Sequence, residues 1–83
     1  MKVKILGSGC AACKSMFNDV IRIVDRNHWN IEVEYVQDIT RIMSYGVMAT
    51  PVLVIDEKVV MVGHHGFGKI EQALQNAANS QGV

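Results

Sequence analysis

Residues 5–17 read "ILGSGCAACKSMF" and hold both cysteines of the 83-residue chain, Cys10 and Cys13. A short apolar run precedes them, Gly7 and Gly9 interrupt that run, and apolar residues at helical spacing follow. The stretch therefore predicts a strand, a tight turn and a helix that begins at the first cysteine.

The two cysteines are compatible with three roles. At a helix start, free backbone N–H groups and the helix dipole favour the thiolate of Cys10, and Lys14 adds positive charge nearby. The two-residue spacing lets the pair close into a disulfide, in which case the outer cysteine attacks a substrate disulfide and the inner one resolves it. Two thiolates also suit a soft ion such as Cu(I) or half a zinc site, and a purely structural role is the third reading. The spacing alone leaves redox chemistry and metal binding open.

The composition is that of a small soluble protein. The length fits one domain and leaves no room for a second, and the 49% of apolar residues suffices for a core. Eight acidic and eight basic residues cancel, so we expect no nucleic-acid partner. No apolar run has the roughly 20 residues of a membrane span, and the N-terminal apolar stretch is too short for a secretory signal. We expect a cytoplasmic monomer without a membrane partner, and in that compartment a close cysteine pair more often does chemistry or binds metal.

Apolar periodicity and turn residues predict seven elements. We expect strands over residues 3–6, 31–36, 52–55 and 58–62, and helices over residues 10–25, from the cap residue Asp38 to Tyr45, and around residues 70–77. The two-residue linker Asp56-Glu57 forces the last two strands into an antiparallel hairpin. Gly46 is placed to end the second helix, and residues 79–83 are expected as a frayed tail. The order predicts an α/β fold with a four-stranded mixed sheet (strand-helix-strand-helix-strand-strand-helix) and helices on both faces.

Helical spacing also predicts which side chains are buried. They are Cys13, Met16, Phe17, Val20, Ile21 and Val24 in the first helix, Ile39, Ile42 and Met43 in the second, and Met48 and Met61 as further core filler, with Met48 nearest the rim of the site. We expect the Lys4 stem to run outward along apolar surface, and not to place a base beneath Cys13. His64 and His65 lie between glycines and are expected on the solvated surface.

The dipeptide Thr50-Pro51 directly precedes the third predicted strand. A proline is tolerated at a strand start because its missing N–H costs no ladder hydrogen bond. By base rate alone, this peptide bond would be trans.

Taken together, these features resemble the thioredoxin superfamily. A CxxC pair caps the first helix and a Thr-Pro dipeptide opens the hairpin; the motifs "GSGCAAC", "GVMATP", "VID" and "VG" match those of small glutaredoxin-like, thioredoxin-fold "redox-active disulfide" proteins. The likeness covers nearly the whole chain. It implies a three-layer thioredoxin-like domain over residues 1–83 and a protein-disulfide oxidoreductase that acts in electron transfer and cell redox homeostasis.

The resemblance also implies roles for individual residues. Cys10 would be the nucleophile and Cys13 the resolving thiol, and together they would form the redox-active disulfide with no further cofactor. Pro51 would be a cis-proline that faces the cysteines, and the backbone of Thr50 would pair with a substrate peptide in the manner of β-augmentation. The implied partners are a disulfide-containing protein or small thiol substrate and a thiol reductase.

The chain departs from the typical pattern between the cysteines, where Ala11-Ala12 replaces the Gly-Pro of thioredoxins and the Pro-Tyr of glutaredoxins. No glutathione-carboxylate clamp is found. The alternative function is a carrier that holds Cu(I) between the same two thiolates. Small copper carriers, however, have the element order strand-helix-strand-strand-helix-strand. They also have a Met two residues before the first cysteine, where this chain has Ser8. Both differences favour redox chemistry.

Overall fold

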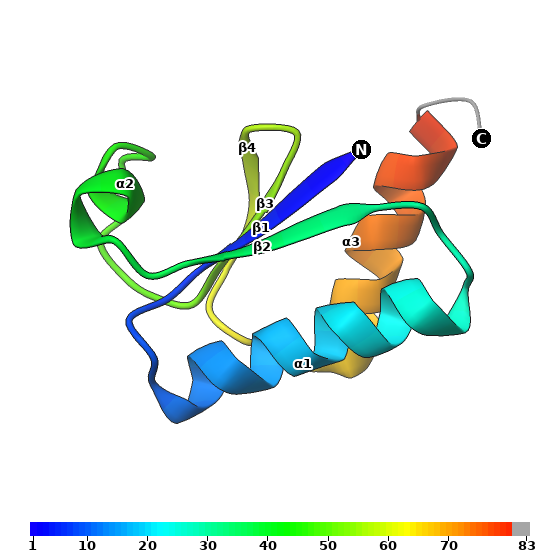
Figure 1. The fold of residues 1–83 in the computed structure, drawn as a ribbon, viewed down its shortest axis with the longest axis horizontal. Helices are drawn as coiled ribbons and strands as arrows, with labels where there is room; N and C mark the ends of the chain where they lie inside the picture. Colours follow the sequence, from blue (N-terminus) through cyan, green and yellow to red (C-terminus); the bar gives the residue numbers. More distant parts are fainter. Residues whose placement is uncertain (81–83) are drawn as a thin grey trace.

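Seven elements build the fold, which a computed structural model describes for residues 1–80 (Figure 1). Along the chain they are β1 Lys2–Leu6, α1 Ala11–Arg26, β2 Glu32–Val36, α2 Ile39–Met43, β3 Val52–Ile55, β4 Lys58–Val62 and α3 Phe67–Ser80. The order is the predicted one. Asn79 and Ser80, expected in a frayed tail, belong to α3, and residues 81–83 of that predicted tail lie outside the described residues.

The four strands form one mixed sheet in the order β2-β1-β3-β4. β1 pairs with β2 in parallel, and β3 pairs with β1 and β4 in antiparallel fashion. The turn between β3 and β4 is Asp56-Glu57, with φ of 49° and 68°. A type I′ two-residue hairpin needs this pair of left-handed residues. The predicted fold class is confirmed.

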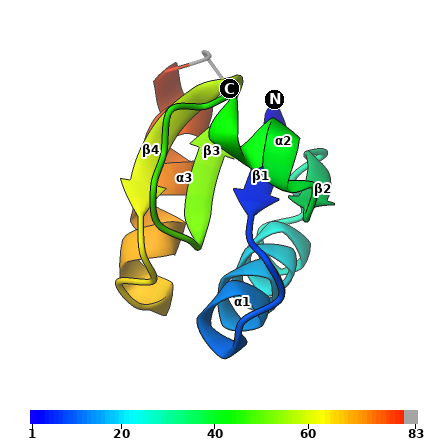
Figure 2. The same ribbon diagram turned by 90° about the vertical axis from the view of Figure 1, so that its left-hand side faces the viewer.

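Helices cover both faces of the sheet. α1 and α3 pack together on one face, and α2 covers the other; in Figure 2, α2 lies in front of the strands and α3 behind them. All residues of β3 are buried, which explains why this strand is an uninterrupted apolar run. None of the helices within residues 1–80 combines the length and the apolar character needed to cross a membrane.

The buried residues of α1 are spaced three or four positions apart and are Cys13, Met16, Val20 and Ile23. Ile21 was expected on this face but is 42% exposed. Successive helical residues are turned by about 100°, so Ile21 lies well off the line that Val20 and Ile23 share. The expectation for Ile21 is therefore wrong, and Ile23 completes the core face in its place.

α2 is shorter than expected and buries a single side chain. Asp38 caps it as predicted, and its Oδ1 accepts a hydrogen bond of 2.9 Å from the backbone N–H two residues on. Ile42 is buried, whereas Ile39 and Met43 are 65% and 67% exposed. A five-residue helix makes little more than one turn, so only one position faces the sheet. The inward placement expected for Ile39 and Met43 is wrong.

Lys4 is a buried charged residue on the face of the sheet that α2 covers. It pairs in register with Val54, and its ammonium donates to the Tyr45 hydroxyl at 3.0 Å and forms an ion pair with Glu57. The hydrogen bond with Glu57 raises the pKa of Lys4 above 10.5, and the same bond lowers the pKa of Glu57 below 4.5. The ammonium therefore joins β1 to the β3–β4 turn. The Lys4 side chain, only 10% exposed, ends in a part-buried ion pair, where an outward course to the solvated surface was expected.

Replacing Glu57 by Gln should lower the free energy of unfolding at neutral pH. It should also make that free energy depend less on pH in the acidic range. The folded-state pKa of Glu57 lies below its ordinary value of 4.5. The pair with Lys4 therefore stabilises the folded chain above pH 4.5, and this contribution disappears as the pH falls through the folded-state pKa. Urea unfolding from about pH 3 to pH 7 measures the effect. Glu32→Gln, at an exposed site in β2, is the matched control; an acid dependence in Glu57→Gln equal to that of the unmodified chain would contradict the role of the pair.

Candidate functional site

Cys10 and Cys13 lie at the start of α1 and are joined by a disulfide, with Cα atoms 5.0 Å apart. Cys10 is the N-cap residue, and its Sγ accepts a hydrogen bond of 3.1 Å from the backbone N–H of Cys13. Its sulfur thus replaces the side-chain oxygen that usually caps a helix. The sulfur is held where free N–H groups and the helix dipole stabilise negative charge.

The two cysteines differ in their access to solvent. Cys10 is exposed, whereas Cys13 is fully buried. Of the two residues, only Cys10 is therefore accessible to another molecule.

Gly7, directly after β1, provides the space in which Cys13 packs. A Cβ built on Gly7 would lie 2.7 Å from Cys13 Cβ and 2.8 Å from Cys13 Sγ, nearer than unbonded carbon and sulfur atoms approach. The N–H of Gly7 donates to the carbonyl of Val36 at 3.0 Å, which ties this backbone to the end of β2. Gly7 was interpreted from the sequence only as a strand breaker, so its contact with Cys13 was missed.

Thr50 and Pro51 lie beside the cysteines because of the strand register. Leu6 pairs with Val52 in the antiparallel β1–β3 ladder, so the chain that leaves β1 passes the chain that enters β3. Thr50 Oγ1 lies 3.7 Å from Cys13 Sγ. Pro51 is buried, and the Thr50–Pro51 peptide bond is cis. The two motifs singled out from the sequence therefore meet at one place.

An apolar groove of about 370 Å³ adjoins this place, and sequence reasoning did not identify it. Its lining side chains are uncharged and come from the β1–α1 turn, from α2 and from the loop before β3. They are Ser8, Ile39, Ile42, Met43, Val47, Met48, Ala49 and Thr50. Met48 was expected as core filler but is fully exposed, because no element covers this loop. Met43 and Ile39, the two exposed apolar residues of α2, line the same groove.

Three further polar candidates are Lys14, His64 and His65. Lys14 is exposed on α1. His64 Nε2 lies 2.8 Å from Asp19 Oδ2 and its side chain is only 25% exposed, so the expectation of a solvated His64 is wrong. His65 is exposed as expected, and its Nε2 is 2.8 Å from the carbonyl of Val62. The His64–Asp19 pair fastens the β4–α3 loop to α1.

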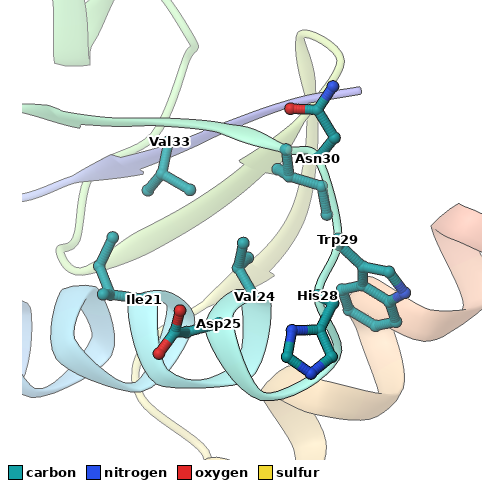
Figure 3. A pocket seen from close by; sticks show the side chains of 8 residues that line it. Ile21, Val24, Asp25, His28, Trp29, Asn30 and Val33 are labelled. Carbon is teal, nitrogen blue, oxygen red and sulfur yellow. The ribbon is translucent and has the colours of Figure 1, made fainter.

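A larger hollow of about 630 Å³ lies at the opposite end of α1 from the cysteines (Figure 3). The side chains of Ile21, Val24 and Val33 form its apolar wall, and Asp25, His28 and Asn30 lie at its polar edge. The disulfide does not border this hollow, so we do not assign it to the cysteine site. Across residues 1–80, no group of three or more His, Cys, Asp or Glu side chains is arranged to hold a metal ion.

Comparison with known proteins gives a consistent result. The sequence model of the family described as "Thioredoxin domain" matches residues 1–75. A thioredoxin of Methanothermobacter thermautotrophicus is 29% identical over 63 residues, which cover 76% of this chain and 82% of that protein.

A solved structure shares the fold over the full length of both chains. Thioredoxin 1 of Thermosipho africanus TCF52B superposes with a TM-score of 0.72 at 17% sequence identity, and 100% of each chain is covered. At this identity the likeness concerns the fold alone.

Gly7→Ala should destabilise the chain by about 1–3 kcal/mol, as over-packing of a filled site does. The added methyl group would meet both Cβ and Sγ of Cys13, so the start of α1 must shift. Urea unfolding of the oxidised protein measures the loss. Gly68→Ala is the matched control, because a Cβ on Gly68 meets nothing within 4 Å and an alanine in a helix costs less than a glycine. Equal stability of the two variants would contradict the close packing of Cys13.

Proposed function

The chain belongs to the thioredoxin domain family and is at that level a thiol–disulfide oxidoreductase, and we propose that Cys10 and Cys13 carry its two electrons. The observation that carries this proposal is the disulfide at the start of α1, with one exposed and one buried sulfur. The buried sulfur is protected from outside reagents, while the exposed one is free to meet a substrate.

The proposed reaction begins with the reduced protein. The Cys10 thiolate attacks a substrate disulfide, a mixed disulfide forms, and the first substrate sulfur leaves as a thiolate that takes up a proton. The Cys13 thiolate then attacks the Cys10 sulfur and expels the second substrate thiolate. Two electrons have moved to the substrate, and the protein is left with the Cys10–Cys13 disulfide.

The cap position supports Cys10 as the attacking group. Its sulfur already accepts a backbone hydrogen bond from the first turn of α1, and a thiolate there gains from the helix dipole. The neighbouring Lys14 adds positive charge without blocking access, because its side chain is exposed.

We propose that Thr50 and Pro51 bind the substrate. The cis bond lies beside the disulfide, where the backbone of Thr50 can pair with an extended peptide as one rung of β-augmentation. The apolar groove begins at Thr50 and Ser8, so residues that flank the substrate cysteine would rest in it. Because the side chains that line the groove are uncharged, the groove favours a protein disulfide whose neighbouring residues are apolar over a small charged thiol such as glutathione.

A thiol reductase is the proposed partner that returns two electrons to the disulfide after each cycle. A monomeric state and a cytoplasmic location stay predictions.

A redox titration with thiol counting, with and without Cu(I), tests the function. A reversible two-electron couple, unchanged by Cu(I) at equimolar concentration, is the expected result. Tight loading of Cu(I) without catalysis of disulfide exchange would instead favour the carrier function.

Cys13→Ser should accumulate a mixed disulfide with substrate, because attack by Cys10 survives and resolution does not. Cys10→Ser should form no such adduct and should lose exchange activity. Mass spectrometry of the protein after incubation with a disulfide-bonded substrate distinguishes the two variants. Trapping through Cys13 in place of Cys10 would show that the roles are reversed.

Met48→Asp should lower kcat/KM for a protein disulfide about tenfold, the order expected when one apolar side-chain contact is lost. The rate with a small uncharged disulfide such as 2-hydroxyethyl disulfide should stay the same, because that molecule does not reach the groove. Met48→Leu keeps the groove apolar and should keep the activity with both. A similar decline with both substrates would count against substrate binding in the groove.

A further inference from the structure

The hydroxyl of Tyr35 is buried and has no hydrogen-bond partner among the residues that the structure describes. Tyr35 lies in β2, and its ring stacks on that of Phe17 of α1, with centroids 5.1 Å apart and planes inclined by 23°. A phenylalanine would make this stacking contact equally well. The hydroxyl therefore needs an explanation other than packing, because a buried polar group without a partner is costly.

The ring of Tyr35 reaches the place where Cys13 is packed. A Cβ on Gly7 would lie 3.3 Å from Tyr35 Cε1 and 2.8 Å from Cys13 Sγ. The two side chains thus meet over the same glycine. Cε1 is adjacent to the ring carbon that bears the hydroxyl, so the edge of the ring next to the hydroxyl borders the same glycine as the sulfur.

The need for a donor at this place depends on the redox state. In the disulfide, Cys13 Sγ is neutral and bonded to Cys10. In the reduced protein, resolution requires a thiolate at a fully buried position, where a charge without hydrogen-bond donors is unfavourable. The hydroxyl of Thr50, 3.7 Å away, is one donor for that charge, and a second would stabilise it further.

We propose that the Tyr35 hydroxyl donates a hydrogen bond to the Cys13 thiolate in the reduced protein and is thereby a positioning residue for the resolving thiol. The proposal rests on the proposed function. The hydroxyl keeps its proton throughout: Cys13 forms the bond to the Cys10 sulfur, and the departing substrate thiolate takes a proton from water. In the disulfide state that the structure holds, the hydroxyl has no partner, and the proposed hydrogen bond forms once Cys13 is reduced.

The polar and charged groups near Cys13 come from two segments. α1 contributes Cys10 and the exposed Lys14, and the loop before β3 contributes the uncharged Thr50. The second tyrosine, Tyr45, is engaged with Lys4 and Glu57, away from the cysteines. It therefore provides a control for the loss of a phenolic hydroxyl.

The test is Tyr35→Phe in the Cys10→Ser background, where Cys13 is the single thiol. Thiolate absorbance is followed against pH. The titration midpoint of Cys13 should rise by about one pH unit, which corresponds to a tenfold smaller thiolate fraction at neutral pH. Tyr45→Phe in the same background should leave the midpoint where it was. An unchanged midpoint in Tyr35→Phe, or an equal shift in both variants, would overturn the proposal.

With both cysteines present, Tyr35→Phe should slow the release of the mixed disulfide about tenfold at neutral pH and regain the normal rate at alkaline pH. A slow release at every pH would indicate a structural role and would also overturn the proposal. If the unmodified chain proves inactive in exchange, the proposed function fails, but the midpoint of the single thiol still decides the role of Tyr35.

A measurement on the unmodified chain avoids any dependence on the folding of a variant. The ¹³C chemical shift of the hydroxyl-bearing ring carbon of Tyr35 should differ between the oxidised and reduced protein and should follow the titration of Cys13. That of Tyr45 should stay constant. A Tyr35 chemical shift that is the same in the oxidised and the reduced protein would contradict the proposed hydrogen bond.

Discussion

The close packing of Cys13 against Gly7 is the constraint on which the rest of the site depends. No Cβ separates the end of β1 from the first turn of α1, so the helix approaches until Cys13 is fully buried. This approach fixes the helix start and leaves the cap residue Cys10 outside, where its sulfur accepts a hydrogen bond from the first turn. A side chain at position 7 would move the helix start, and both sulfurs would move with it relative to Thr50. The exposure of one cysteine and the burial of the other are therefore two results of a single contact.

The antiparallel pairing of β1 with β3 supplies the other half of the site. Because Leu6 pairs with Val52, the turn after β1 and the loop before β3 lie at the same edge of the sheet. A parallel pairing would have placed that loop at the opposite edge, far from the cysteines. Residues separated by 37 positions, Cys13 and Thr50, come within 3.7 Å for this reason. The topology that joins β3 to β4 by a two-residue hairpin is thus also the topology that assembles the site.

The sequence predicts those features that adjacent residues determine. The bounds of β3 and β4, their tight turn and the capped start of α1 depend on local apolar runs and turn chemistry, and they were predicted correctly. Ile39 and Met43 were placed wrongly, because an apolar residue does not reveal whether another element covers it. The groove and the contact of Gly7 with Cys13 could not be predicted, because each joins segments that are distant in the sequence. The positions of Thr50 and Pro51 were expected only through the family resemblance, since no local rule places a loop next to a helix start.

The unequal burial of the two sulfurs separates the capture of a substrate from its release. In the proposed reaction, capture would involve groups at the surface: the exposed Cys10, the backbone of Thr50 and the uncharged groove beside it. Release involves Cys13, which can only attack from inside and must carry a negative charge where water does not reach it. Surface changes should therefore alter which substrates are accepted, whereas changes in the buried layer between α1 and β2 should alter how fast they leave. The small side chains of Ala11 and Ala12 lie between the cysteines and add little to either step. In the proposed reaction, we therefore expect the groove to set the substrate specificity and the buried surroundings of Cys13 to set the rate of release.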